Sequence, residues 1–422
     1  MDIKKYYLKH KRLTKTLSLD VITKGLGFLF IPLFLKCMSK EEFGLYSYLI
    51  FAVLNFSYLL KGGLDTALTK LYFDYHGTDK GKVVFTISTS ILVIFLVFFF
   101  CCLFTNIDDW AFNKITSGSV AYSGYFFPIM GYILLYNVTA ILNNFYIATS
   151  NVGTFQKWNL VKVLAQNLIA YGLVRIAISS DKASIRLLSE ALAGIVFLFP
   201  LILHFYKRLV FTFDFKILKR SLNIGLPTLG GVLIGIIYTF SDKFYLQKYT
   251  GIASLAVYNL GMLLATPIGI IFGSFNILWL SEFFQENDLT VSFKKTTKVY
   301  LRFLLVYVLL FVVLMAGVWL LLRLNIIDKA YYDVLYVLPL LYIFRVLDNL
   351  CHLYDNFYIK LEKTLFTLIL TVIIGAMAFT LFLKFIPVYG MYACAFVLVA
   401  MELLRTLVMV FYIKRKIFTA KV

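Results

Sequence analysis

The sequence has little charge and little cysteine for its length. Only 15% of its 422 residues are charged and 61% are hydrophobic, whereas soluble domains carry about 25% charged and about 45 to 50% apolar residues. This composition excludes a set of soluble domains with polar surfaces and indicates a polytopic membrane protein. The 5 cysteines lie in apolar stretches without disulfide or metal spacing, so they predict neither a disulfide framework nor a metal site.

Motifs of catalysis and of cofactor binding are also missing. The sequence contains no GxSxG, no HExxH, no CxxC and no Walker-type glycine-rich loop. We therefore predict that the protein is not an enzyme and that it uses no cofactor and no metal. Transport driven by ATP hydrolysis within this chain is not expected.

The charge that is present is mostly positive. Lys and Arg total 41 against 22 Asp and Glu, which gives a formal net charge of +19. The basic residues do not form a patch, so no nucleic-acid partner is predicted. The chain begins with the basic segment MDIKKYYLKHKR, and no small-residue cleavage site follows the first apolar run. This start predicts a cytoplasmic anchor for a first span instead of a cleaved signal peptide.

Long apolar windows recur along the whole chain. A membrane span needs about 20 mostly apolar residues, and about twelve such windows can be marked. The predicted spans lie at 13–37, 44–70, 83–105, 119–146, 157–179, 186–207, 217–241, 252–280, 296–323, 333–357, 363–386 and 389–413. We expect an all-α polytopic membrane protein with about twelve transmembrane helices and with both termini on one side.

Basic residues are distributed unequally between alternate loops. With the N-terminus inside, inner segments hold about 24 Lys and Arg, and outer loops hold about 10. Positively charged loops are retained in the cytoplasm, so both termini are expected there. The inner segment HFYKRLVFTFDFKILKR joins the sixth span to the seventh. We predict an N-terminal six-helix lobe at 1–207, a cytoplasmic linker at 208–216 and a C-terminal six-helix lobe at 217–422.

A short match between the two halves indicates an internal repeat. FLKCMSKEEFGLYSYL begins at Phe34 and YLQKYTGIASLAVYNLG begins at Tyr245; with one extra residue in the second copy, Tyr46 aligns with Tyr258. Both copies join the first and second spans of their half, as in transporters built from repeats. Chance similarity between two membrane hairpins is the alternative interpretation.

A few ionisable residues lie inside the predicted spans. Such a group costs several kcal/mol in hydrocarbon unless it faces a cavity or a partner, so each is a functional candidate. Asp20 with Lys24, and Lys61 with Asp65, are spaced four residues apart and share a helix face. All four are expected between the midplane and the cytoplasmic side, which suggests a polar cavity open to the cytoplasm. Alternatively, each pair neutralises itself and locks helix against helix.

The tenth predicted span carries a longer polar stripe. Arg345, Asp348, His352 and Asp355 share one helical face. Packing rarely needs four ionisable residues on one face, so the stripe favours a function. Weaker candidates in other spans are Lys162, Gln166 and Asn167, and Glu402 with Arg405, for which a structural ion pair is the favoured interpretation.

Three stretches of sequence carry a family resemblance. They are LTKTLSLDVITKGLGFLFIPLFLKCMSKEEFGLYSYL in the first hairpin, KGGLDTALTKLYFDY at the end of the second span, and SDKFYLQKYTGIASLAVYNLG between the seventh and eighth spans. The chain resembles the polysaccharide flippases (Wzx type) of the multidrug/oligosaccharidyl-lipid/polysaccharide exporter superfamily. The resemblance implies a twelve-helix flippase of two lobes around a central cavity, in a bacterial inner membrane.

The resemblance also implies a substrate and partners. The substrate would be an undecaprenyl-pyrophosphate-linked oligosaccharide, moved from the cytoplasmic to the periplasmic leaflet for synthesis of O-antigen, the polysaccharide of lipopolysaccharide, or of a related surface glycan. Partners would be membrane lipids, a coupling proton or sodium ion, and polymerase and chain-length proteins of the same pathway.

The chemistry of this substrate predicts which side chains bind it. Cations would offset the charge of the pyrophosphate, and Arg matches the geometry of oxyanions. Carboxylates are candidates for ion coupling because they can change charge during the cycle. The expected residues are Lys24, Lys61 and Arg345 for the head group, Asn137, Asn143 and Tyr238 for the sugars, and Asp20, Asp65 and Asp348 for ion coupling.

Two other functions stay open. A drug/cation antiporter of the same superfamily would favour buried carboxylates, whereas seven cations lie in predicted spans here and favour an anionic substrate: Lys24, Lys61, Lys162, Arg175, Arg302, Arg345 and Arg405. A membrane enzyme of glycan assembly would need a sizeable outer loop, and the longest outer loop is TNIDDWAFNKITSG.

Overall fold

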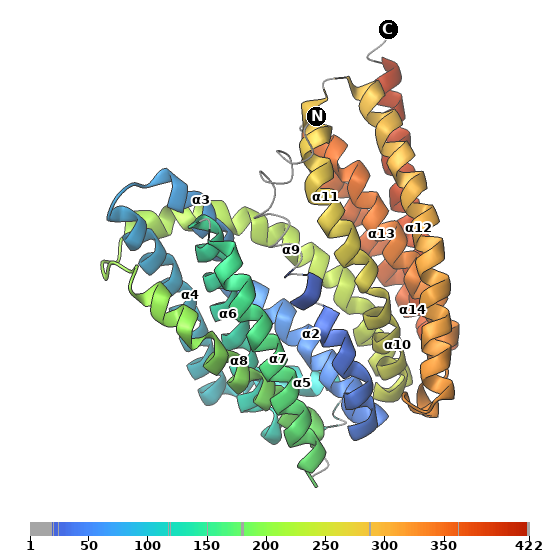
Figure 1. Ribbon diagram of the computed structural model, residues 1–422, viewed down its shortest axis with the longest axis horizontal. Helices are drawn as coiled ribbons and strands as arrows, with labels where there is room; N and C mark the ends of the chain where they lie inside the picture. Colours follow the sequence, from blue (N-terminus) through green and yellow to red (C-terminus); the bar gives the residue numbers. More distant parts are fainter. Residues whose placement is uncertain are drawn as a thin grey trace. The chain divides into compact units, whose positions relative to one another are not determined.

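The computed structural model describes residues 19–419 except 20, 24, 117, 119, 150, 179–180, 287 and 362, and for some residues of 227–239, 274–285, 364 and 417–419 it describes the backbone alone. Helices account for most of this part of the chain, and no strand occurs in it (Figure 1). The predicted all-α class is therefore confirmed. The helices pack into two compact units, Met1–Ile236 and Ile237–Val422.

The first unit is built around α8, which packs against α2, α6 and α7. An initial helix ends at residue 37, and Ser39 then caps the next helix through a reciprocal hydrogen-bond pair with Glu42. The elements that follow are α2 (Lys40–Lys61), α3 (Leu64–Asp74), α4 (Asp79–Thr105), α5 (Ile107–Thr116), η1 (Tyr122–Gly124), α6 (Phe126–Ala148), α7 (Val152–Ile176), α8 (Lys182–Tyr206) and the first part of α9 (Phe215–Thr250).

Two glycines break the second predicted span. Gly62 and Gly63 have φ of 57° and 70°, a left-handed conformation that glycine adopts without steric cost. The window predicted as one span at 44–70 is therefore two helices, α2 and α3. A Cβ added to Gly225 would lie 2.8 Å from the carbonyl oxygen of Gly62. The start of α9 thus packs directly on the break, where a larger residue would collide with backbone.

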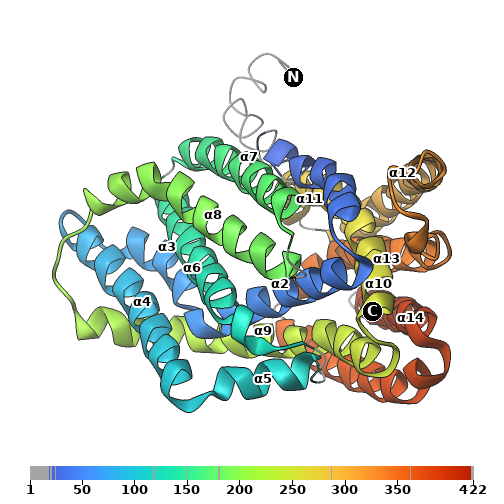
Figure 2. The same cartoon turned by 90° about the horizontal axis from the view of Figure 1, so that it is seen from below.

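The second unit surrounds α13. The remainder of α9 is followed by α10 (Ile252–Ala265), α11 (Pro267–Gln285), α12 (Leu289–Arg323), η2 (Lys329–Tyr331), α13 (Val334–Lys360) and α14 (Thr364–Thr419). α13 packs against α10, α11, α12 and α14, and the two views of the ribbon show it among them (Figures 1 and 2). It therefore forms the core of this unit, and its polar residues are placed by neighbours on several sides.

Two further helix breaks occur in the second unit. The first divides a predicted span, and the second lies near the start of another predicted span. The predicted span at 252–280 is interrupted at Thr266, because Pro267 begins α11 and lacks the N–H that would continue α10. In α14, Gly390 has φ 55° and ψ −133°, which interrupts the helical path. The predicted spans at 363–386 and 389–413 lie before and around this interruption.

Eight of the described helical segments are long and apolar enough to cross a membrane. They differ in how much protein surrounds them. In the apolar window of α13, 56% of the residues are buried, whereas in that of the 35-residue α12 only 11% are buried. The apolar surface of α12 is thus left for lipid, while α13 faces protein.

Candidate functional site

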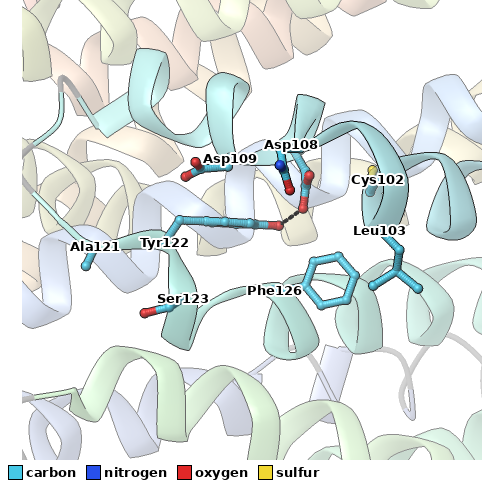
Figure 3. Close-up of a pocket in the computed structure, with 9 residues that line it drawn as sticks. Cys102, Leu103, Asp108, Asp109, Ala121, Tyr122, Ser123 and Phe126 are labelled. Carbon is cyan, nitrogen blue, oxygen red and sulfur yellow. Dashed lines mark hydrogen bonds between the residues drawn. The ribbon is translucent and has the colours of Figure 1, made fainter.

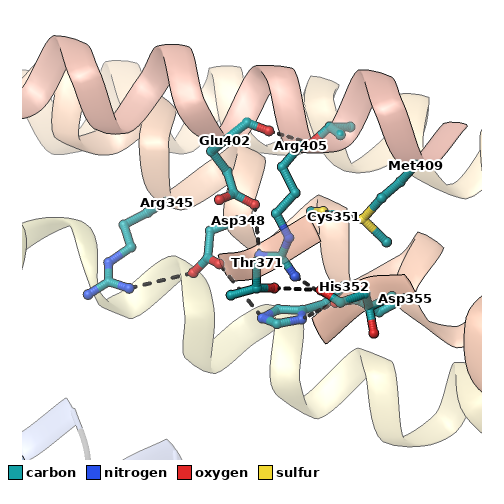
Figure 4. A network of polar contacts seen from close by, with 11 residues as sticks. Arg345, Asp348, Cys351, His352, Asp355, Thr371, Glu402, Arg405 and Met409 are labelled. Carbon is teal, nitrogen blue, oxygen red and sulfur yellow. Dashed lines mark hydrogen bonds and ion pairs between the residues drawn. The ribbon is translucent and has the colours of Figure 1, made fainter. Parts of the chain in front are cut away.

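The polar stripe predicted on the tenth span is a connected chain of charges on α13 (Figure 4). Arg345 Nη1 lies 3.6 Å from Asp348 Oδ2, and His352 Nε2 lies 3.8 Å from Asp348 Oδ1. On its other side, His352 Nδ1 lies 2.9 Å from Asp355 Oδ2. The structure therefore brings together all four residues of the stripe.

The stripe continues onto α14 through Arg405. Its Nη2 lies 3.2 Å from Asp355 Oδ2, and its Nη1 lies 3.2 Å from Glu402 Oε1. Glu402 is only 1% exposed. Glu402 and Arg405, interpreted from sequence as an isolated structural pair, thus belong to a larger set. We name Arg345, Asp348, His352, Asp355, Glu402 and Arg405 the α13–α14 network.

The charges of the α13–α14 network balance under one condition. Its three carboxylates face two guanidinium groups and one imidazole, so the formal charges cancel when His352 is protonated. Arg405 sits between two of the carboxylates with 16% of its side chain exposed. A buried ion pair depends strongly on both partners, so Arg405 holds α14 to α13.

Arg345 lies at the open end of the network. Its side chain is 34% exposed and its contact with Asp348 is long at 3.6 Å. Its Nε is buried and has no hydrogen-bond partner within the described part of the chain. The partial exposure and the long contact leave the side chain able to reach an external oxyanion, with the planar geometry that binds two oxygens at once.

Lys61 and Asp65 flank the break between α2 and α3. Lys61 Nζ lies 3.0 Å from Asp65 Oδ2, with 5% and 13% of the side chains exposed. The ammonium also lies 4.2 Å from the centre of the Tyr58 ring. Each member of the pair belongs to a different helix, so the ion pair bridges the glycine break.

Asn137 lies beside this region on α6. Ser57, one helical turn before Lys61 on α2, donates to Asn137 Oδ1 over 2.8 Å. Asn137 is fully buried, and its Nδ2 has no partner among the described residues. This side chain therefore offers an unsatisfied buried donor next to a predicted head-group cation.

The structure describes only some of the other predicted site residues. Asn143 is half-buried on α6, and its neighbour Asn144 accepts a hydrogen bond from Thr69 over 3.3 Å. Asp20 and Lys24 lie outside the described residues, and so does the side chain of Tyr238, whose backbone belongs to α9. The juxtaposition of Asp20 and Lys24 with Lys61 and Asp65 stays a prediction.

A buried ion pair on α8 was missed by the sequence interpretation. Arg186, counted there with an outer loop, is 7% exposed, and its Nε lies 2.9 Å from Glu190 Oε1. The guanidinium lies 3.5 Å from the centre of the Phe34 ring and 3.7 Å from that of Tyr46. The i, i+4 spacing of the pair was a signal available in the sequence, but the predicted span began at Arg186 itself.

Glu190 and Asp242 occupy similar settings in the two units. Glu190 Oε2 accepts hydrogen bonds from Tyr46 and Tyr132, each over 2.6 Å. Asp242 Oδ2 accepts from Tyr258 over 2.5 Å, and Lys243 Nζ lies 3.2 Å from Asp242 Oδ1. Each buried carboxylate is thus shared between a cation and a tyrosine, and those tyrosines include the two that the sequence repeat aligns.

An acidic pocket of about 450 Å³ lies at the end of α4, next to α5 and η1 (Figure 3). Asp108, Asp109, Tyr122 and Ser123 are among the residues that line it. The Tyr122 hydroxyl donates to Asp108, and burial, together with this hydrogen bond, raises the pKa of Tyr122. Two carboxylates in one pocket repel anions, so this pocket does not suit a phosphate-bearing substrate.

Comparison with known proteins identifies the family. A family model described as polysaccharide biosynthesis protein matches residues 11–280. A search of curated proteins found no match. Among solved structures, the chain is similar to one described as lipid II flippase MurJ in an inward closed conformation, with 17% identity and a TM-score of 0.69 over 94% of this chain and 87% of that one.

Two transporters of the MOP superfamily show the same fold. An inward-facing MATE family multidrug resistance transporter has 14% identity and a TM-score of 0.63, over 96% of this chain and 94% of that one. A MOP superfamily transporter from Pyrococcus furiosus has 13% identity and a TM-score of 0.56, over 97% and 96%. These likenesses extend over nearly the whole chain, and the family resemblance drawn from the sequence is confirmed. The chain is a multi-pass membrane protein with the fold of MOP superfamily transporters, and it belongs to the polysaccharide biosynthesis protein family.

Proposed function

We propose that the protein is a flippase that moves undecaprenyl-pyrophosphate-linked oligosaccharides across a bacterial inner membrane by alternating access. Transport would run from the cytoplasmic to the periplasmic leaflet and would supply O-antigen or a related surface polysaccharide. Family membership supports the pathway, and the relative described as a lipid II flippase supports a lipid-linked substrate. The observation that carries the proposal is the partly exposed side chain of Arg345, whose contact with Asp348 is long at 3.6 Å.

Moving this substrate across the membrane requires a polar route for its head group alone. A pyrophosphate and a sugar chain lose their hydration in hydrocarbon at a large cost, whereas the polyprenyl tail is stable in lipid. Cations along the route would replace part of the hydration of the pyrophosphate. We assign this role to Arg345 in one unit and to Lys61 and Lys24 in the other, with Asn137, Asn143 and Tyr238 as sugar contacts.

We assign ion coupling to carboxylates that hold the cations. Asp348 lies next to Arg345, and Asp65 lies next to Lys61. Protonation or sodium binding at such a carboxylate weakens its hold on the neighbouring cation and frees that cation for the pyrophosphate. Asp20 is assigned the same role beside Lys24. Polymerase and chain-length proteins would then receive the exported unit.

The proposed topology has twelve spans with both termini in the cytoplasm. In this topology α2 with α3, and α10 with α11, each form one broken span, and α14 forms two spans that meet near Gly390. The chain is non-helical between Tyr206 and Phe215, which supports a linker at 208–216 between lobes 1–207 and 217–422. The excess of basic residues in alternate loops supports the orientation.

A drug/cation antiporter is the second candidate, because the fold is also that of MATE transporters. A site for cationic drugs would present carboxylates without counter-charges. Among the side chains that the structure describes, the three most buried acidic ones are Glu190, Asp242 and Glu402. They instead lie within 3.2 Å of the basic groups of Arg186, Lys243 and Arg405. The pairing of these carboxylates favours an anionic substrate.

The test replaces Arg345 in cells that lack the chromosomal copy. Arg345→Ala should reduce surface glycan by at least about tenfold, because the charge-assisted hydrogen bonds to an oxyanion are lost, and lipid-linked units should accumulate on the cytoplasmic leaflet. Arg323→Ala, which removes an exposed arginine at the end of α12, is the matched control. Wild-type glycan in Arg345→Ala cells with normal protein levels would refute the role of Arg345, and dye efflux by the wild-type protein would favour the antiporter.

A further inference from the structure

A second polar pocket, of about 380 Å³, lies in the first unit at the ends of its helices. Its walls come from segments far apart in the sequence: α3, the start of α4, the turn between α6 and α7, and the end of α8. The polar residues that line it include Lys80, Thr149, Asn151, His204 and Arg208. None of them belongs to the proposed transport route.

The two cations of this pocket are held by packing. Lys80 Nζ lies 4.8 Å from the centre of the Tyr72 ring, which also lines the pocket. A Cβ on Gly81 would lie 3.0 Å from the carbonyl oxygen of Arg208. The backbone after α8 therefore packs directly on the first turn of α4, and this contact brings Lys80 and Arg208 to one pocket.

The positive charge of the pocket is not neutralised by nearby carboxylates. No Asp or Glu is among the described residues that line it. The acidic residues nearest to Lys80 in sequence have other partners, because Asp79 pairs with Lys82 at 2.9 Å and Asp74 pairs with Arg220 at 2.5 Å. The first turn of α7, whose N-cap is Asn151, adds the positive end of a helix dipole. Lysine, arginine, histidine and amide donors around an anion-sized space are the chemistry that binds a phosphate group.

The surroundings of the pocket are typical of a membrane surface. The neighbouring segments leave large aromatic side chains exposed, with Phe73 at 58%, Tyr206 at 58% and Phe211 at 60%. Aromatic residues next to cations are common at the level of lipid headgroups. The proposed topology places this end of the unit at the cytoplasmic leaflet, and this placement rests on that topology.

We propose that the pocket between Lys80 and Arg208 is a binding site for a phosphate group at the membrane surface, separate from the transport route. The phosphate belongs to an anionic phospholipid headgroup or to a soluble phosphate compound. Its binding ties the start of α4, the α6–α7 turn and the end of α8 together, since each contributes a lining residue.

The experiment measures binding to the purified full-length protein without any transport step. One arm uses nanodiscs of phosphatidylcholine with increasing phosphatidylglycerol and counts bound phosphatidylglycerol by native mass spectrometry. The other arm titrates inorganic phosphate into protein in pure phosphatidylcholine nanodiscs. Lys80→Gln with Arg208→Gln should lower the affinity by at least about tenfold in one arm or both, because two charge-assisted contacts are lost.

Controls and outcomes separate the sources of phosphate. Lys219→Gln removes an exposed lysine of α9 in the same unit that does not line the pocket, so it should bind as the wild type does. Arg208→Lys keeps the charge and should retain most of the affinity. Lys80→Gln alone, which removes one of the two lining cations and should lower the affinity, replaces the double variant if that one does not fold. A loss limited to phosphatidylglycerol identifies a lipid headgroup, and a loss with inorganic phosphate identifies a soluble compound. Equal binding by the double variant and by Lys219→Gln in both arms refutes the site. If the protein proved not to be a flippase, these binding results would be unchanged, because the experiment includes no transport step.

Discussion

The Tyr258 hydroxyl donates to Asp242 Oδ2 over 2.5 Å, and both side chains are at most 1% exposed. Tyr46 makes a similar contact in the other unit, where its hydroxyl lies 2.6 Å from Glu190 Oε2 on α8. The sequence repeat aligns these two tyrosines. In each unit the tyrosine therefore links the second helix of a hairpin to a buried carboxylate that also pairs with a cation.

Tyr258→Phe should reduce the stability of the protein by about 1.5 to 3 kcal/mol, because Asp242 then loses a hydrogen bond to a buried charged group. The measurement is thermal unfolding of the purified protein in detergent. Tyr307→Phe is the control, since Tyr307 is equally buried but its hydroxyl has no hydrogen-bond partner in the described chain. Equal melting temperatures for the two variants would contradict the importance of the Tyr258 contact.

Arg186→Ala should destabilise the first unit by about 3 to 5 kcal/mol, because it leaves the buried carboxylate of Glu190 without its cation. Replacing both residues, as Arg186→Met with Glu190→Leu, removes both charges and should cost less than the sum of the single changes. Thermal unfolding of Arg186→Met, Glu190→Leu and the double variant gives the coupling energy. Strict additivity would show that the pair contributes nothing beyond its separate side chains.

Gly225→Ala should lower stability by about 1 to 3 kcal/mol, because the new methyl group meets the backbone of Gly62 and Gly63 at 2.8 Å. Gly172→Ala in α7 has no atom within 4 Å of the added carbon and should raise stability by about 0.5 to 1 kcal/mol through helix propensity. Melting temperatures that shift in the same direction would mean that α9 does not pack tightly on the break.

Replacing the two arginines of the α13–α14 network should affect different properties, stability for Arg405 and transport for Arg345. Arg405→Ala leaves Glu402 and Asp355 without their shared cation and should cost about 3 to 5 kcal/mol. Arg345→Ala removes a partly exposed contact and should cost less than about 1 kcal/mol, although it is expected to reduce surface glycan at least about tenfold. Thermal unfolding and surface glycan are both measured. The reverse pattern, with Arg345 deciding stability, would assign Arg345 to structure.

Cysteine labelling tests the orientation. In a variant without native cysteines, Lys114→Cys in α5 should react with an impermeant maleimide added to intact spheroplasts, whereas His76→Cys between α3 and α4 should react only after the membrane is opened. Both positions are exposed in the structure. Labelling of position 76 in intact spheroplasts would overturn the proposed topology.

Regular helix positions were predictable because hydropathy averages over many residues. The same averaging hid the breaks at Gly62–Gly63 and at Pro267, although glycine pairs and prolines are local signals in the sequence. The stripe from Arg345 to Asp355 was predictable because its residues share one face of one helix. The contact of Arg405 with Asp355 joins two residues that are 50 positions apart in the sequence, and no local pattern encodes such a contact.

The length and exposure of α12 have a mechanical consequence. At about 1.5 Å per residue its 35 residues extend for about 50 Å, which exceeds a hydrocarbon thickness of about 30 Å. The helix must therefore tilt or project into the aqueous phase, and its fit depends on bilayer thickness. Because so little of it is buried, any rotation of α12 displaces acyl chains instead of protein. The thickness and fluidity of the host membrane thus become part of the energy that each conformational change of the second unit requires.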